Sequence, residues 1–280
     1  MHTWEEARAK WLREGFWRAP ETKRREAALL AWAEPHLAGR RVASITRADL
    51  EQLRDRKRAE GSSPRTANYV AQVVGAILRR CVRWEWMDRA PSIERLHEGP
   101  AREVFLTPRQ AAQLLAALPE HLQLLAEFSL ETGLRQGNAR LLEWRHVDME
   151  RNRLYLPGEA VKNRKALLVP LTPRARAILR QCRGDHPRFV FTYDGAPMLQ
   201  PRNSAWYRAL RRLGMVGVRW HDLRHTWASW HMAAGTDPLV LQKLGGWKTW
   251  AMVSRYTHLD DRTAQRAVRR FAGVARRGAA

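Results

Sequence analysis

The chain has 280 residues and a mass of 32.5 kDa, which suffices for one large domain or two modest ones, and we expect two. Lysine and arginine number 50 against 28 acidic residues, and the net charge of +22 indicates a polyanionic partner rather than a small acidic metabolite. Hydrophobic residues make up 45% of the chain and include 13 tryptophans, which excludes a disordered basic tail.

The chain carries no signal for a membrane or for export. Its apolar runs, such as residues 27–33 and 122–126, are far shorter than the ~20 residues of a membrane-spanning helix. The N-terminus lacks the basic and then apolar order of a secretory signal, so we expect a cytoplasmic protein without membrane contact. Cys81 and Cys182 stand far apart, which predicts neither a disulfide framework nor a thiolate zinc site.

Residues 1–97 have the periodicity of helices and lack the alternation of half-buried strands, so they predict an all-helical domain. Pro64 suits the first turn of the last of these helices, in which one face is apolar and another carries arginines. The predicted helices cover residues 3–14, 21–34, 46–60 and 64–87.

A polar segment punctuated by Pro and Gly, residues 98–104, predicts a linker to a second domain over residues 105–280. Two stretches rich in Leu and Val, around a turn at residues 163–165, predict a small antiparallel sheet. The expected strands are 153–156 and 166–170, with a short one near Val161, and the expected helices are 108–118, 120–131, 173–182, 201–213, 222–234, 238–244 and 260–271. The fold class is therefore mainly α (α+β).

The helix predicted to open near residue 222 groups His221, Arg224 and His225 on one side, opposite an apolar stripe. His221 and Arg224 can address the oxygens of one phosphate, aided by the N–H groups of the first helical turn. The alternatives are a solvated polar face, or a zinc site formed by the two histidines. Zinc is disfavoured because Asp222 stands where a metalloprotease has Glu, and no third ligand is evident.

Four motifs in order resemble the tyrosine recombinases, and the phage integrase branch most closely. The resemblance is strong over residues 105–280, while residues 1–97 are similar to the core-DNA-binding domain of that family in helix count and linker. The motifs are Thr132-Gly133-Leu134-Arg135 with Leu141-Leu142-Glu143-Trp144 and Val147-Asp148; Val161-Lys162 before Leu168-Val169-Pro170-Leu171; His221-Asp222-Leu223-Arg224-His225-Thr226 with Leu244-Gly245-Gly246-Trp247; and Arg255-Tyr256-Thr257-His258.

The resemblance implies that Tyr256 attacks a DNA phosphodiester, leaving a 3′-phosphotyrosine and a free 5′-hydroxyl. It implies that Arg135 and Arg224 stabilise the negative charge on the non-bridging phosphate oxygens. The planar, always charged guanidinium suits this role. The resemblance assigns Lys162 as the general acid for the 5′-oxygen. Lys165 and Arg164 are nearby alternatives, and cations around an exposed turn can also simply contact DNA.

Two more site residues follow from the resemblance. His221 matches the histidine that helps to manage the tyrosine proton, and Trp247 stands where the family carries His or Trp as a phosphate donor and packing support. An indole donates a hydrogen bond but transfers no proton at neutral pH, so acid–base duty falls on His221 and Lys162. Asn138 replaces an acidic residue that often supports the basic groups of the site, and we expect altered tuning there.

The implied protein is a site-specific DNA recombinase or integrase that closes as a C-shaped clamp around double-stranded DNA, without metal or nucleotide cofactor. Strand exchange implies a homo-tetramer in the synaptic complex, with residues 260–280 as a docking tail anchored by Val268 and Phe271. Accessory DNA-bending proteins are compatible with this role. We expect no separate arm-binding domain before Trp4.

Two other functions share parts of this pattern. A type IB topoisomerase uses the same phosphotyrosine chemistry to relax DNA, and it differs in sequence preference and oligomeric state. A non-catalytic, sequence-specific DNA-binding regulator needs phosphate positioning but no nucleophile, and the intact set of reactive residues argues against it.

Overall fold

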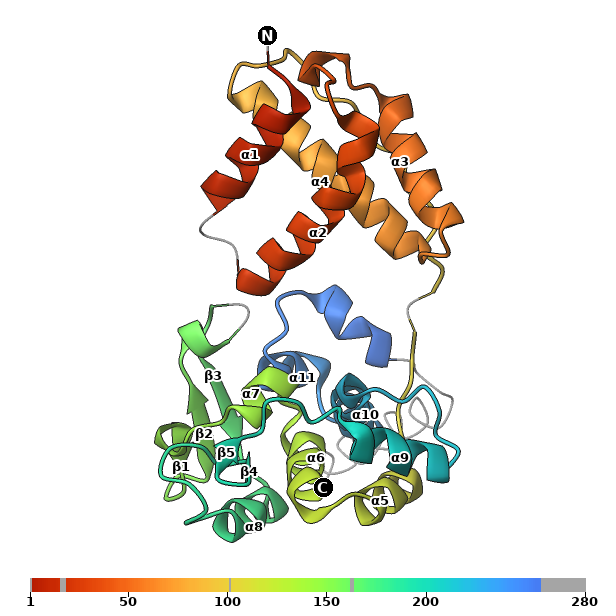
Figure 1. The fold of residues 1–280 in the computed structure, drawn as a ribbon. Coiled ribbons are helices and arrows are strands. Elements are labelled where there is room, and N and C mark those ends of the chain that lie inside the picture. The colour runs from red at the N-terminus through yellow and green to blue at the C-terminus, as the bar shows by residue number, and fades with distance from the viewer. Residues whose placement is uncertain (1, 16–18, 101, 162–163, 258–280) are drawn as a thin grey trace, which may run out of the picture. The chain divides into compact units, whose positions relative to one another are not determined.

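The computed structural model describes residues 2–15, 19–100, 102–161 and 164–257 (Figure 1). The chain divides into two compact units, Met1–Ala101 and Arg102–Ala280. Each unit has a hydrophobic cluster of its own.

Four helices form the N-terminal unit, and each begins where the sequence offers a local start signal. Thr3 and Thr46 form capping boxes with Glu6 and Asp49, and Ser63 caps the helix that opens with Pro64. The helices are α1 (Trp4–Glu14), α2 (Pro20–Leu37), α3 (Arg47–Ala59) and α4 (Pro64–Arg83).

Helix α4 supplies the centre of this unit, because its apolar stripe is buried against the other three helices. Val70, Val74, Ile77 and Cys81 are all at most 1% exposed. The helix ends at Arg83 rather than at the predicted residue 87, because Glu85 adopts a positive φ of 61° that no helix continues through.

The C-terminal unit is mainly helical with two small sheets. Its helices are α5 (Pro108–Ala117), α6 (Glu120–Thr132), α7 (Gln136–Arg140), α8 (Pro173–Gln181), α9 (Ser204–Arg212), α10 (Trp220–Ala233) and α11 (Pro238–Gly245). Its strands are β1 (Val147–Asp148), β2 (Arg153–Leu156), β3 (Leu167–Pro170), β4 (Thr192–Tyr193) and β5 (Ala196–Pro197).

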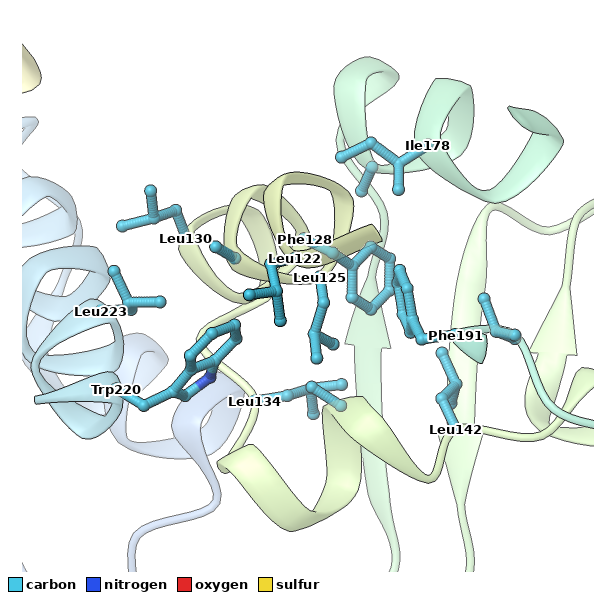
Figure 2. Packing of buried hydrophobic residues seen from close by; sticks show 14 of the residues in the cluster. Leu122, Leu125, Phe128, Leu130, Leu134, Leu142, Ile178, Phe191, Trp220 and Leu223 are labelled. Carbon is cyan, nitrogen blue, oxygen red and sulfur yellow. The ribbon is translucent and has the colours of Figure 1, made fainter. Parts of the chain in front are cut away.

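Helix α6 runs through the core of this unit. Figure 2 shows Phe128 of α6 facing Phe191 on one side, while Trp220 and Leu223 of α10 approach from the other. The two phenylalanine rings have centroids 5.1 Å apart, and Phe128 is fully buried. Burial of one such side chain contributes about 1.5–3 kcal/mol, so α6 holds α10 on one side and the segment that carries Phe191 on the other.

The larger sheet has the order β1-β2-β3 and is antiparallel, with Leu154 opposite Val169. The strands predicted at 153–156 and 166–170 are confirmed. The strand predicted near Val161 is wrong: a 3₁₀ helix at Gly158–Ala160 precedes this residue, and the N–H of Arg164 donates to the Val161 carbonyl over 2.8 Å. Val161 is buried as part of this compact connection, which explains its apolar character.

Other differences from the predicted elements are small. Helix α7 and the two strands of the β4–β5 hairpin are not among the predicted elements. The hairpin turns at Asp194-Gly195, with positive φ at both residues. Helix α2 continues to Leu37 with Pro35 inside it. The predicted helix 260–271 lies outside the described residues.

A mainly helical fold with a small antiparallel sheet is confirmed. No helix in the described part of the chain is long and apolar enough to cross a membrane.

Candidate active site

Helix α10 carries three of the polar residues singled out by the sequence. Its Asp222 accepts a hydrogen bond from the N–H of Arg219 over 2.7 Å, which caps the first turn. Leu223 and Trp227 are at most 4% exposed and hold the helix in the hydrophobic clusters of the unit. The orientation of the polar side chains is therefore set by packing on the opposite face.

Arg224 is 4% exposed, so the alternative of a solvated polar face is wrong at this position. Its Nη1 and Nη2 groups donate to the carbonyls of Gly133 and Gly245, each over 2.5 Å. Its guanidinium also lies 4.3 Å from the ring centroid of Trp247. Burial, aided by the charge of Arg135, lowers the pKa of Arg224 to about 9, which leaves it charged at neutral pH.

Two glycines allow this arrangement. Gly133 ends α6 with a φ of +61°, and a Cβ on it would lie 2.2 Å from the ring of Trp227. A Cβ on Gly245 would lie 2.1 Å from the ring of Trp247. The glycines of the predicted motifs therefore let carbonyls and tryptophan rings approach the buried arginine.

Arg135 is the N-cap residue of α7, and its guanidinium reaches the turn at Gly245–Gly246. Its Nη2 donates to the carbonyl of Gly246 over 3.4 Å, and its side chain is half-buried. Burial lowers the pKa of Arg135 from its ordinary value. Arg135 and Arg224 thus present two guanidinium groups to the Gly245–Gly246 turn, which gives the site a positive field suited to an anion.

Tyr256 lies in the 3₁₀ helix Ser254–Tyr256, and its hydroxyl is hydrogen-bonded to Nδ1 of His225. Its ring packs beside Trp247, with centroids 5.7 Å apart. Burial raises the pKa of Tyr256 despite the opposing charges of Arg255 and Arg224, so the phenol keeps its proton at neutral pH.

The histidine that contacts Tyr256 differs from the expected one. The resemblance implies that His221 manages the tyrosine proton, whereas the structure pairs the hydroxyl with His225. His221 lies beside His225 in an edge-to-face contact, with ring centroids 4.9 Å apart. The two residues stand one helical turn apart on one face of α10, which is the only sequence signal that points to His225.

Both histidines are neutral at neutral pH. Burial lowers the pKa of His225, with Asp222 opposing and Arg255 and Arg224 reinforcing the effect. Desolvation, the nearby His225 ring and the charge of Arg224 lower the pKa of His221 to about 4, although His221 is an exposed residue. In the tautomer of His225 that carries its proton on Nε2, the phenol O–H of Tyr256 donates its hydrogen bond to Nδ1.

Trp247 and Lys162 are the remaining predicted site residues. Trp247 packs against Arg224, Tyr256 and Trp227. Lys162 lies outside the described residues. The connection that carries it is held from α7, because Nδ2 of Asn138 donates to the carbonyl of Ala160 over 2.6 Å.

The zinc alternative gains no support from the described residues, where no group of three or more His, Cys, Asp or Glu side chains is placed to hold a metal ion. The pair His221 and His225 is instead occupied with Tyr256 and with each other.

A comparison with family models matches residues 104–263 to the phage integrase family. The chain belongs to this family. The matched range contains all six predicted site residues, and it contains His225 as well. The phage integrase match therefore covers the whole cluster around Tyr256.

A comparison with an individual relative supports this membership of the phage integrase family. The chain is 38% identical over 200 residues to the integrase of Salmonella phage P22, a match that covers 66% of this chain and 52% of the P22 protein. The chain thus spans about half the length of that relative.

Two solved structures share the fold. An integrase of the transposon Tn1549 in complex with a circular intermediate DNA has a TM-score of 0.77 at 18% identity, covering 95% of this chain and 98% of the other. A lambda integrase tetramer bound to a Holliday junction has a TM-score of 0.71 at 14% identity, covering 93% and 80%.

Proposed function

We propose that this chain is a site-specific DNA recombinase that cleaves and rejoins strands through a 3′-phosphotyrosine. The observation that carries the proposal is the hydrogen bond between Tyr256 and His225, beside two arginines that converge on one turn. A nucleophile, a proton acceptor and two fixed cations are the parts that phosphoryl transfer to a hydroxyl requires.

In the proposed reaction, the Tyr256 oxygen bonds to phosphorus while the bond from phosphorus to the 5′-oxygen breaks. The phenol proton passes to Nδ1 of His225, whose pKa is low enough for it to be unprotonated at neutral pH. The 5′-oxygen takes a proton from Lys162, and without one it would leave as a strongly basic alkoxide. The phosphotyrosine conserves the energy of the bond, so resealing needs no nucleotide or metal.

Arg135 and Arg224 neutralise the negative charge that grows on the non-bridging oxygens. Two of the five N–H groups of Arg224 are used by the carbonyls of Gly133 and Gly245, and the others remain for a phosphate. Donors fixed in this way are worth about 3–4 kcal/mol each in related oxyanion sites. Trp247 supports Arg224 by stacking on it.

The test is formation of a covalent adduct. The chain is incubated with nicked suicide duplexes made from the DNA that flanks its gene, denatured, and run on a gel beside unreacted DNA. We expect a band shifted by the mass of the protein. The absence of any adduct with every flanking fragment would contradict the proposal.

The two histidines give a matched pair of variants for the proton step. We expect His225→Gln to slow adduct formation by about 10²–10⁴, the usual worth of a general base, and His221→Gln to slow it less. Single-turnover rates at pH 7 measure the difference. A larger loss of rate in His221→Gln would instead identify His221 as the proton acceptor, as the resemblance implies.

We propose double-stranded DNA as the partner, bound largely through phosphates, in keeping with the net charge of +22. If at least six phosphates are contacted, affinity should fall about a thousandfold between roughly 50 and 200 mM salt, with a log–log slope of about −0.9 per phosphate. Fluorescence anisotropy measures the slope, and a duplex with neutral methylphosphonate links is the control with a smaller slope. A flat titration would exclude phosphate-dominated binding.

We also propose that the N-terminal unit and the catalytic unit close on DNA as a clamp, and that four copies form the synaptic complex in the cytoplasm. The tetrameric form of a structural neighbour supports this number. Residues 260–280, proposed as the docking tail, lie outside the described residues. The relatives named integrase favour strand exchange over relaxation or regulation.

A further inference from the structure

The segment 102–106, called the linker end here, lies along one face of α10. The guanidinium of Arg102 donates two hydrogen bonds to the carboxylate of Asp222, with Nη1–Oδ1 and Nη2–Oδ2 distances of 3.3 and 2.9 Å. Nη2 of Arg102 also donates to the carbonyl of Gly217 over 2.5 Å, just before α10 begins. Arg102 therefore fastens the linker end to the first turn of the helix.

Two further hydrogen bonds continue along the same helix face. The N–H of Leu106 donates to Oγ1 of Thr226 over 2.9 Å, and Nε1 of Trp230 donates to the carbonyl of Leu106 over 3.0 Å. Asp222, Thr226 and Trp230 are spaced four residues apart, so three successive turns of α10 hold the linker end.

Asp222 connects this contact to the candidate active site. It follows His221 directly and precedes His225 by one helical turn, and its side chain is only 5% exposed. A carboxylate so little exposed requires a charged or hydrogen-bonding partner, because an unpaired buried charge is costly. Arg102 and the N–H of Arg219 supply these partners.

We infer that Arg102 and Asp222 are positioning residues for the nucleophile's proton acceptor: the pair fixes the first turn of α10 and sets the charge that acts on His225. This inference rests on the proposed function for its consequence in catalysis, but the pair and its effect on His225 are properties of the protein alone.

The charges around His225 decide in which direction each substitution should shift the pKa of this histidine. The Asp222 carboxylate raises the pKa of His225 and the Arg102 guanidinium lowers it, within the larger lowering by burial. The titratable and charged groups around this ring and its Tyr256 partner are His221, Asp222 and Arg224 on α10, Arg255 and Tyr256 on the 3₁₀ helix, and Arg102 and Glu103 on the linker end. Loss of Arg102 should therefore raise the pKa of His225, and loss of the Asp222 charge should lower it.

The experiment is an NMR pH titration of the full chain labelled with ¹³C at histidine Cε1, with the His225 signal assigned by its absence in His225→Gln. We expect Arg102→Gln to raise the pKa of His225 by about half a unit and Asp222→Asn to lower it by a similar amount. Asparagine keeps an oxygen for the N–H of Arg219, so the helix cap survives this change.

The matched control is Arg40→Gln in the N-terminal unit. Arg40 holds Asp49 in an equivalent two-point contact of 2.8 and 3.0 Å, and the side chains of Arg40 and Arg102 are both 37% exposed. We expect this variant to lower the melting temperature without moving the pKa of His225. A merely structural Arg102–Asp222 pair would behave in the same way as the control.

Shifts of the same sign in both variants, or no shift, would overturn the inference. If Asp222→Asn fails to fold, Arg102→Gln alone still decides the sign. Where the wild type forms the covalent adduct, the acid limb of its pH–rate profile should follow the NMR shifts. A wild type that forms no adduct while the NMR shifts appear would refute the proposed function and leave the pair established.

Discussion

Replacing Tyr256 by phenylalanine abolishes the covalent adduct and leaves DNA affinity within about twofold of the wild type, because the change removes one hydroxyl and nothing else. The phenyl ring retains the packing of Tyr256 beside Trp247 and Val253. His225 loses its hydrogen-bond partner but stays neutral, since its pKa is already lowered by burial. The arginines keep their carbonyl partners, so the anion-binding part of the site is unchanged.

The measurement uses the nicked suicide duplex, with peptide mapping of any DNA-linked fragment. Tyr193→Phe and Tyr207→Phe are the controls, because these tyrosines are 54% and 46% exposed and neither has the His225 contact. Both controls should form the adduct at the wild-type rate. A shifted band that persists in Tyr256→Phe, or a DNA-linked peptide that contains Tyr193 or Tyr207, would assign the nucleophile elsewhere.

The helix starts were predictable because their causes are local. Thr46 with Asp49, and Thr107 before Pro108, place side-chain caps within four residues of the N–H groups that they satisfy. Helices α3 and α5 begin directly after these caps. The short strands and the turn at Asp194 depend on pairing with other segments, and the apolar pattern of Val161 fits a buried turn as well as a strand.

The site was predictable as a set of residues but not as a set of contacts. Sequence spacing puts His221 and His225 on one face of α10, and nothing local decides which of them meets Tyr256. That choice is made by the packing of the 3₁₀ helix Ser254–Tyr256, whose tyrosine is 31 residues from His225. The resemblance favours His221, and the geometry selects its neighbour.

The burial of Arg224 could not be predicted from the local sequence pattern either. Its two carbonyl partners are 91 and 21 residues away, and they approach because the residues that carry them are glycines. An arginine on the polar face of a helix is expected to be solvated, and only the distant turns at Gly133 and Gly245 bury this one. The same turns make the guanidinium rigid, which is what a preorganised phosphate site requires.

Replacing Lys162 by alanine should lower the rate of cleavage of ordinary DNA by about 10²–10⁴, the usual worth of a general acid. With sulfur in place of the 5′-bridging oxygen, the same variant should cleave at nearly the wild-type rate. A thiol is far more acidic than an alcohol, with a pKa near 8.5 for cysteine, so a thiolate leaves without being protonated. Rescue by sulfur therefore identifies the step in which the lysine acts.

Lys165→Ala is the matched control, since it removes an equal charge from the same connection between β2 and β3. If Lys162 is the acid, this control should lose activity equally on both substrates, by whatever it contributes to DNA binding. An equal loss on both substrates in Lys162→Ala would instead make that residue a DNA contact. If sulfur rescues Lys165→Ala and not Lys162→Ala, the proton comes from Lys165.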